Sequence, residues 1–238
     1  HYTPNRGLPE LCDLIAKELK RQHRAGYAPD EEIIVTMGVS QGLDLVLRSI
    51  INPGDEVIIP EPCYVSYGAN VTLLGGKPVY VPTYFSEEFK VDIERLKNAV
   101  TPRTKAVLLN YPSNPTGNTL PRELLEKIAA LAEERNFFII SDEIYSAISY
   151  EKEHWSIISL PAVKDRVIYL NGFSKSHAMT GWRLGYVAGP AYLVNMMLKI
   201  HQYTALCAPS LSQYAAVEAL GNSQKDVKTM RAEYMKRR

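Results

Sequence analysis

Short apolar runs alternate with amphipathic helical patterns along most of this chain, and no other feature constrains its fold as much. The apolar runs predict strands near residues 33–35, 57–59, 79–81, 106–109, 137–140, 167–170 and 184–187. Helical spacing predicts helices over about residues 8–25, 41–49, 65–74, 93–100 and 121–135, with Gly26 ending the first. Because strands that alternate with helices form a mainly parallel sheet with helices on both faces, the sequence predicts an α/β fold with three α/β/α layers.

The domain organisation follows from where this alternation stops. No long Gly/Ser linker or internal repeat interrupts residues 1–190, so we expect one large domain there. From residue 191 the pattern is helical only. We expect residues 191–238 to complete the large domain and to lead to a C-terminal small domain that is absent or truncated here.

Charge and cysteine content exclude several classes of protein. Lys and Arg total 27 against 26 Asp and Glu, so the chain has no basic excess with which to bind nucleic acid. Cys12, Cys63 and Cys207 are far apart and lack metal-ligand spacing, which argues against a disulfide framework and against a zinc site. No apolar run reaches the roughly 18 residues of a membrane span. We therefore expect a cytoplasmic protein with small-molecule partners, no bound metal and no membrane contact.

Polar side chains follow three of the predicted strands. Asn114 follows the run at 106–109, Asp142 follows the run at 137–140, and Lys175 follows the run at 167–170. Taken singly, such residues are usually turn formers or solvated surface groups. Because the carboxyl ends of parallel strands meet at one edge of a sheet, we expect the three side chains to converge on one crevice.

Three strings in the sequence carry a resemblance to a known family. The string GFSKSHAMTGWRLG at 172–185 resembles the cofactor-attachment signature of class I and II aminotransferases at every defined position. NPTG at 114–117 and SDEIY at 141–145 agree with the same family. The resemblance to these fold-type I enzymes, and within them to the bacterial aminotransferase A-like branch, runs from Tyr2 through nearly the whole chain. It implies that the cofactor is pyridoxal 5'-phosphate (PLP).

The resemblance implies catalytic roles for Lys175, Asp142 and Tyr145. Lys175 would form a Schiff base with the PLP aldehyde and, once released, move a proton as general base and acid. Asp142 would lie beside the ring nitrogen and keep it protonated, so that the ring can draw electrons from the substrate. Tyr145 and Asn114 would hydrogen-bond the phenolic oxygen of the cofactor.

The remaining cofactor contacts concern the ring face and the phosphate. The resemblance implies that Tyr64 stacks on the pyridine ring, a suitable use of a flat aromatic surface. Arg can bind phosphate oxygens with paired hydrogen bonds, and backbone N–H groups at a helix start form an anion cradle. Tyr2 would reach the phosphate of a neighbouring subunit, which implies a homodimer with a shared active site. The phosphate-binding residues implied within this chain are Ser174, Arg183, Val39, Ser40 and Gln41.

The reaction implied by the resemblance is transfer of an amino group between an L-amino acid and a 2-oxo acid by a ping-pong mechanism. Two alternatives stay open. One is a PLP-dependent carbon–sulfur β-lyase or cyclopropane-carboxylate synthase of the same fold, and the other is a non-catalytic PLP-binding module of a bacterial regulator. The family's arginine for the substrate carboxylate is expected in the missing small domain. His177 lies at an undefined position of the signature, and we expect no direct role for it.

Overall fold

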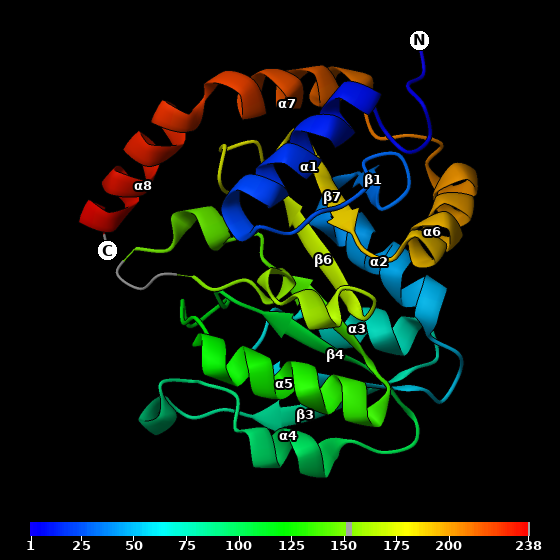
Figure 1. The fold of residues 1–238 in the computed structure, drawn as a ribbon, viewed down its shortest axis with the longest axis vertical. Helices are drawn as coiled ribbons and strands as arrows, with labels where there is room; N and C mark the ends of the chain where they lie inside the picture. Colours follow the sequence, from blue (N-terminus) through cyan, green and yellow to red (C-terminus); the bar gives the residue numbers. More distant parts are fainter. Residues whose placement is uncertain (151–153, 238) are drawn as a thin grey trace.

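A single twisted sheet forms the centre of the molecule, which is known from a computed structural model that describes residues 1–150 and 154–237. Within those residues the sheet has seven strands in the order β1-β7-β6-β5-β4-β2-β3 (Figure 1). The strands are β1 Ile33–Thr36, β2 Glu56–Glu61, β3 Lys77–Pro82, β4 Thr104–Asn110, β5 Phe138–Asp142, β6 Val167–Gly172 and β7 Gly185–Ala188.

The sheet is mainly parallel, which confirms the predicted α/β class. β3, β2, β4, β5 and β6 pair in parallel, whereas β7 is antiparallel to both of its neighbours, β1 and β6. Because β7 alone runs the other way, its amino end lies at the edge where the other strands have their carboxyl ends. Residues just before β7 therefore reach the same crevice as residues just after β4, β5 and β6.

Helices cover both faces of the sheet, each over its own apolar cluster. One face carries α1 Pro9–His23, α4 Ile93–Ala99, α5 Arg122–Arg135 and α7 Ser210–Asn222, and the other carries α2 Gly38–Ile50, α3 Ser66–Leu73 and α6 Ala191–Thr204. Short 3₁₀ turns occupy Phe85–Glu87, Ser146–Ile148, Ile157–Ser159 and Pro161–Val163. The last helix, α8 Gln224–Arg237, follows α7 and has no buried residue (Figure 1). None of the described helices is long and apolar enough to cross a membrane.

Two helix boundaries differ from the sequence prediction. α1 ends at His23, because Arg24 takes the left-handed conformation (φ 58°) and donates its N–H to the Lys20 carbonyl. The expectation that Gly26 ends this helix was therefore wrong. α2 begins at Gly38 instead of near Gln41, so residues 38–41 form its first turn.

Candidate active site

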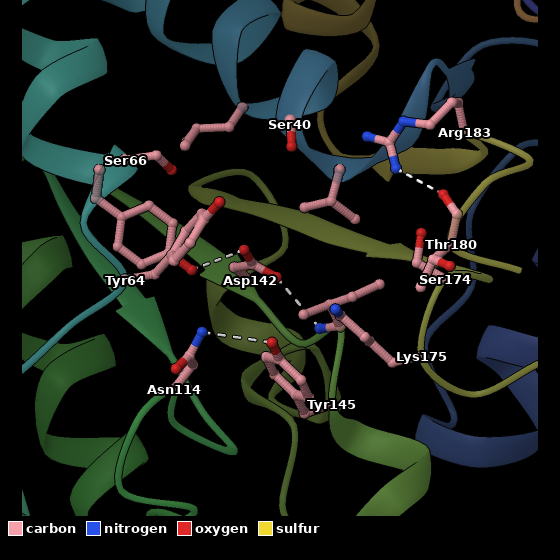
Figure 2. Close-up of a pocket in the computed structure, with 14 residues that line it drawn as sticks. Ser40, Tyr64, Ser66, Asn114, Asp142, Tyr145, Ser174, Lys175, Thr180 and Arg183 are labelled. Carbon is pink, nitrogen blue, oxygen red and sulfur yellow. Dashed lines mark hydrogen bonds between the residues drawn. The ribbon is translucent and has the colours of Figure 1, made fainter. Parts of the chain in front are cut away.

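A pocket of about 310 Å³ opens at the edge where the parallel strands end (Figure 2). Its walls come from the segments that follow β2, β4, β5 and β6, from the segment that precedes β7, and from the start of α2. The lining residues are Val39, Ser40, Leu43, Tyr64, Ser66, Tyr67, Asn114, Asp142, Ile144, Tyr145, Ser174, Lys175, Thr180 and Arg183. The structure thus brings together most of the residues that the sequence singled out, although they span more than half of the chain.

Asp142 is the buried acid of this pocket, with 4% of its surface exposed. One carboxylate oxygen, Oδ2, accepts a hydrogen bond from the Tyr67 hydroxyl at 2.8 Å, and Oδ1 accepts one from the Ile144 N–H at 3.2 Å. Burial raises the pKa of Asp142 to about 6, although both hydrogen bonds act to lower it. None of the described groups that shift this pKa is a cation. The pocket therefore holds a desolvated carboxylate that a positively charged ligand group would stabilise.

Tyr67 is a residue of the site that the sequence analysis missed. It belongs to α3, is 2% exposed, and reaches Asp142 across 75 residues of sequence. Its ring packs edge-on against Tyr64, with centroids 5.6 Å apart. Side chains three residues apart lie on the same side of a helical turn, so the Tyr64–Tyr67 spacing was the available signal.

A second group of polar side chains links the ends of β4 and β5. Asn110, the last residue of β4, donates its side-chain amide to the Asp142 carbonyl at 3.0 Å and accepts the Asn114 backbone N–H at 3.0 Å. The Asn114 side-chain amide donates in turn to the Tyr145 hydroxyl at 3.4 Å. The pKa of Tyr145 is raised by burial and by the charge on Asp142. The Lys175 Nζ lies 5.7 Å from the centre of the Tyr145 ring, so amine, phenol and amide share one side of the pocket.

The opposite side of the pocket combines a helix start with a guanidinium group (Figure 2). Arg183, at the left-handed φ of 51°, donates from Nη1 to the Thr180 carbonyl at 2.9 Å. Gly38 has φ +76°, and a Cβ there would lie only 2.9 Å from Nη2 of Arg183. A Cβ on Gly185 would lie 2.7 Å from the Val39 nitrogen. The two glycines therefore let α2, β7 and Arg183 approach closely, and the result is a corner suited to an anion.

Three residues considered in the sequence analysis do not line the pocket. The Gln41 side chain points back to the start of α2, where Oε1 accepts the Met37 N–H at 2.7 Å. Tyr2 is 82% exposed near the amino end of the chain. His177 contacts the Ser176 hydroxyl through Nδ1 at 2.7 Å and packs against Phe173.

The comparison with protein families decides the identity of this fold. The family model described as aminotransferase class I and II matches residues 1–238. The chain belongs to the class I and II aminotransferase family. Members of this family use PLP, so the family predicted from the three sequence strings is confirmed.

Curated aminotransferases and solved structures agree with this assignment. The putative aminotransferase YugH of Bacillus subtilis (strain 168) is 48% identical over 237 residues, which are 100% of this chain and 61% of YugH. An aspartate aminotransferase of Pyrococcus abyssi is 46% identical over 241 residues, 100% of this chain and 62% of that protein. A crystal structure of an aromatic aminotransferase from Pyrococcus horikoshii OT3 has a TM-score of 0.97 at 45% identity and covers 100% of this chain and 64% of that one. This member of the family thus spans about three fifths of the length of these two relatives.

Proposed function

We propose that the full-length protein transfers an amino group between an L-amino acid and a 2-oxo acid, with PLP held in the pocket described above. The observation that carries the proposal is the joint placement of the Lys175 amine, the buried Asp142 carboxylate and the Arg183 guanidinium around one cavity. Relatives whose names include aspartate and aromatic aminotransferases support the same reaction class.

The pocket fits PLP in two respects. The Asp142 carboxylate is desolvated and has a raised pKa, as a partner for a protonated ring nitrogen would have before binding. The close approach at Gly38 brings the first turn of α2 and the Arg183 guanidinium to one corner of the pocket, where their N–H groups can bind an anion. When bound, the cofactor supplies an aldehyde carbon for the amine and a ring that accepts electrons. The residues proposed to hold it are Lys175 at the aldehyde, Asp142 at the ring nitrogen, Tyr145 and Asn114 at the phenolic oxygen, Tyr64 on the ring face, and Ser174, Arg183, Val39 and Ser40 at the phosphate. Gln41, whose side chain points back to Met37, would contribute to the phosphate site only through its backbone N–H.

Asp142 and Tyr67 act together in this proposal. At pH 7, above its pKa of about 6, Asp142 is mostly ionised, and Tyr67 holds Oδ2 so that the carboxylate keeps one orientation. This buried carboxylate would pair with a protonated ring nitrogen and keep that nitrogen protonated.

Lys175 supplies the proton transfer. Its amine would hold the cofactor covalently at the aldehyde carbon, and an incoming substrate amine would displace it. The free Nζ would then take a proton from the substrate Cα and deliver it to the carbon that the cofactor aldehyde supplies. The Nζ lies 5.7 Å from the centre of the Tyr145 ring, and Ile144 lines the same pocket.

The proposal also covers the subunit organisation and the domain bounds of the full-length protein. We propose a cytoplasmic homodimer in which Tyr2 completes the phosphate site of its partner. We also propose that residues 1–190 form the cofactor-binding domain and that residues 191–238 lead to a small domain. That small domain would supply an arginine for the substrate carboxylate, which Arg binds with paired hydrogen bonds.

Covalent trapping tests the proposal at its centre. The full-length gene product is incubated with PLP and reduced with borohydride, and the modified peptide is identified by mass spectrometry. We expect the adduct on Lys175, no adduct in Lys175→Ala, and an unchanged far-ultraviolet circular dichroism spectrum. Lys127→Ala, which changes an exposed lysine on α5, is the matched control and should be trapped like the wild type. An adduct that persists in Lys175→Ala would overturn the proposal.

A panel of amino donors separates aminotransfer from the alternatives. With 2-oxoglutarate as acceptor, an aminotransferase forms glutamate from at least one donor. A β-lyase instead releases pyruvate and a thiol from cysteine conjugates, and a regulator module converts none of them although it binds PLP. Absence of glutamate with every donor would remove the aminotransferase assignment.

A further inference from the structure

A second buried carboxylate, which the proposed mechanism does not use, directly follows Asp142. Glu143 is only 1% exposed. Its Oε1 accepts hydrogen bonds from the Ser141 hydroxyl at 2.9 Å and the Ser156 hydroxyl at 2.7 Å, and its Oε2 lies 2.5 Å from Nε2 of His154. Both oxygens of the Glu143 carboxylate thus have partners: Ser141 of β5 and Ser156 hold Oε1, and His154 holds Oε2.

The Glu143 carboxyl favours its ionised form although it is buried. Burial alone would raise the pKa of this carboxyl, but His154, His23 and the Ser156 hydrogen bond together hold the pKa below its usual range. A buried ion that loses one of its partners is strongly destabilised, because the remaining charge has no solvent to compensate it. This network therefore favours one arrangement of the backbone that carries Glu143.

Glu143 and Asp142 are on opposite sides of the sheet. Successive side chains of a strand alternate between faces, so Ser141 and Asp142, the last two residues of β5, point to opposite faces. The hydrogen bond from the Ser141 hydroxyl places the Glu143 carboxylate on the Ser141 side. The backbone at this point is also fixed, because the Glu143 N–H donates to the Leu170 carbonyl and the Glu143 carbonyl accepts the Ser146 N–H, each at 2.9 Å. Rotation of the chain at Glu143 would consequently turn Asp142 out of the cofactor pocket.

We propose that Glu143, held by His154 and Ser156, is a positioning residue that fixes the end of β5 so that Asp142 and Tyr145 face the cofactor. The inference rests on the proposed PLP site. Asp142 precedes Glu143 by one residue and Tyr145 follows it by two. The contacts of Glu143 on the opposite face of the sheet would therefore fix the backbone that carries both side chains. The carboxylate acts through these neighbours and touches neither cofactor nor substrate.

Two substitutions at Glu143 separate its hydrogen bonds from the space it fills. In the full-length protein, Glu143→Ala leaves two hydroxyls and an imidazole without their acceptor, and we expect PLP affinity to fall about 10-fold or more. Glu143→Gln keeps the shape: its Oε1 can accept both hydroxyls, and its amide can donate to Nε2 of the other His154 tautomer. We expect this variant to recover most of the lost affinity.

The visible circular dichroism of bound PLP gives a readout that a loss of stability alone does not change, because it reports how the ring is held. We expect Glu143→Ala to alter this signal at saturating PLP and Glu143→Gln to restore it. Leu96→Ala, a buried change on α4, serves as the control: it should lower the melting temperature yet keep the wild-type PLP affinity and visible signal.

Each outcome of this experiment decides the inference. A folded Glu143→Ala protein with wild-type PLP affinity and visible signal overturns it. If Glu143→Ala does not fold, Ser156→Ala, which removes one hydrogen bond, takes its place; a change in the visible signal supports the inference and no change overturns it. If the wild type itself fails to trap PLP on Lys175, the proposed function fails, and this inference with it. If the wild type traps PLP and the Glu143 variants behave like it, only the positioning role fails.

Discussion

At Asp142, the desolvation that raises the carboxyl pKa competes with hydrogen bonds that lower it. The pKa of about 6 lies above the ordinary aspartate value, so the ionised fraction decreases as the pH falls through 6. Only the ionised form pairs with a protonated ring nitrogen. PLP binding should therefore weaken on the acid side of neutrality, and any change that raises the Asp142 pKa further should move this weakening to higher pH.

Tyr67→Phe tests this relation. The substitution removes the donor to Oδ2 and raises the pKa of Asp142, because the lost hydrogen bond favoured the charged form. We expect the PLP affinity of the variant to be about 5-fold below that of the wild type at pH 6. This difference should become smaller towards pH 8, where Asp142 is ionised in both proteins. Titration of both proteins with PLP across this pH range measures the ratio of their affinities. Tyr84→Phe, at an exposed position, is the control, and a ratio that does not vary with pH would refute the explanation.

The same residues mark what sequence can and cannot reveal at a single position. Lys175, Asp142 and Asn114 could be predicted as site residues because each follows a recognisable strand. Tyr67 and Glu143 were not predicted, because neither the Tyr64–Tyr67 spacing nor the SDEIY string shows what their side chains contact. Their importance arises from partners that the folded sheet brings near: Asp142 for Tyr67, and the segment with His154 and Ser156 for Glu143.

At the scale of elements, the start of α2 combines an anion-binding geometry with a backbone constraint. The first turn of a helix has N–H groups without intrahelical acceptors, and the helix dipole adds partial positive charge there. Gly38 begins α2 with a positive φ and lies against the Arg183 guanidinium. A side chain at this position would be strained in its backbone and would displace Arg183.

Gly38→Ala should therefore weaken anion binding at the corner formed by the start of α2 and Arg183. We expect PLP affinity to fall about 10-fold or more, because Arg183 loses its position and the first turn of α2 shifts. Inorganic phosphate should compete with PLP less well in this variant than in the wild type. Gly26→Ala is the matched control: it has open space and no positive φ, so neither affinity nor competition should change. Unaltered phosphate competition in Gly38→Ala would show that the corner does not bind the phosphate.

The elements themselves could largely be predicted, whereas their boundaries and order could not. The seven strands found in residues 1–150 and 154–237 were all predicted from apolar runs, because β-branched and other apolar residues are concentrated in strands that are covered on both faces. The start of α2 was misplaced because Met37 offers no side-chain cap and Gly38 resembles a turn residue. The antiparallel pairing of β7 with β1 depends on contacts across about 150 residues, for which no local pattern exists.

At the scale of the whole molecule, the amino-terminal segment is ordered against α7 while Tyr2 projects from it. The Ser210 hydroxyl donates to the His1 carbonyl at 3.1 Å, and the Gln213 side-chain amide donates to the Thr3 hydroxyl at 2.8 Å. These contacts flank Tyr2, whose side chain is nevertheless 82% exposed and does not line the pocket of its own chain. This arrangement supports the proposal that Tyr2 serves the phosphate site of a partner subunit.

Hybrid dimers test whether the site is shared. A Lys175→Ala subunit keeps Tyr2, and a Tyr2→Phe subunit keeps Lys175, so a shared site predicts that their heterodimer contains one site with both wild-type residues and one with neither. We expect purified, doubly tagged hybrids to trap PLP at half of their sites with wild-type affinity, whereas Tyr2→Phe homodimers bind it about 10-fold more weakly at every site. If each subunit used its own Tyr2, the Lys175-bearing site of the hybrid would keep the weak affinity of the Tyr2→Phe homodimer. The affinity of that single site therefore distinguishes a partner's tyrosine from the chain's own.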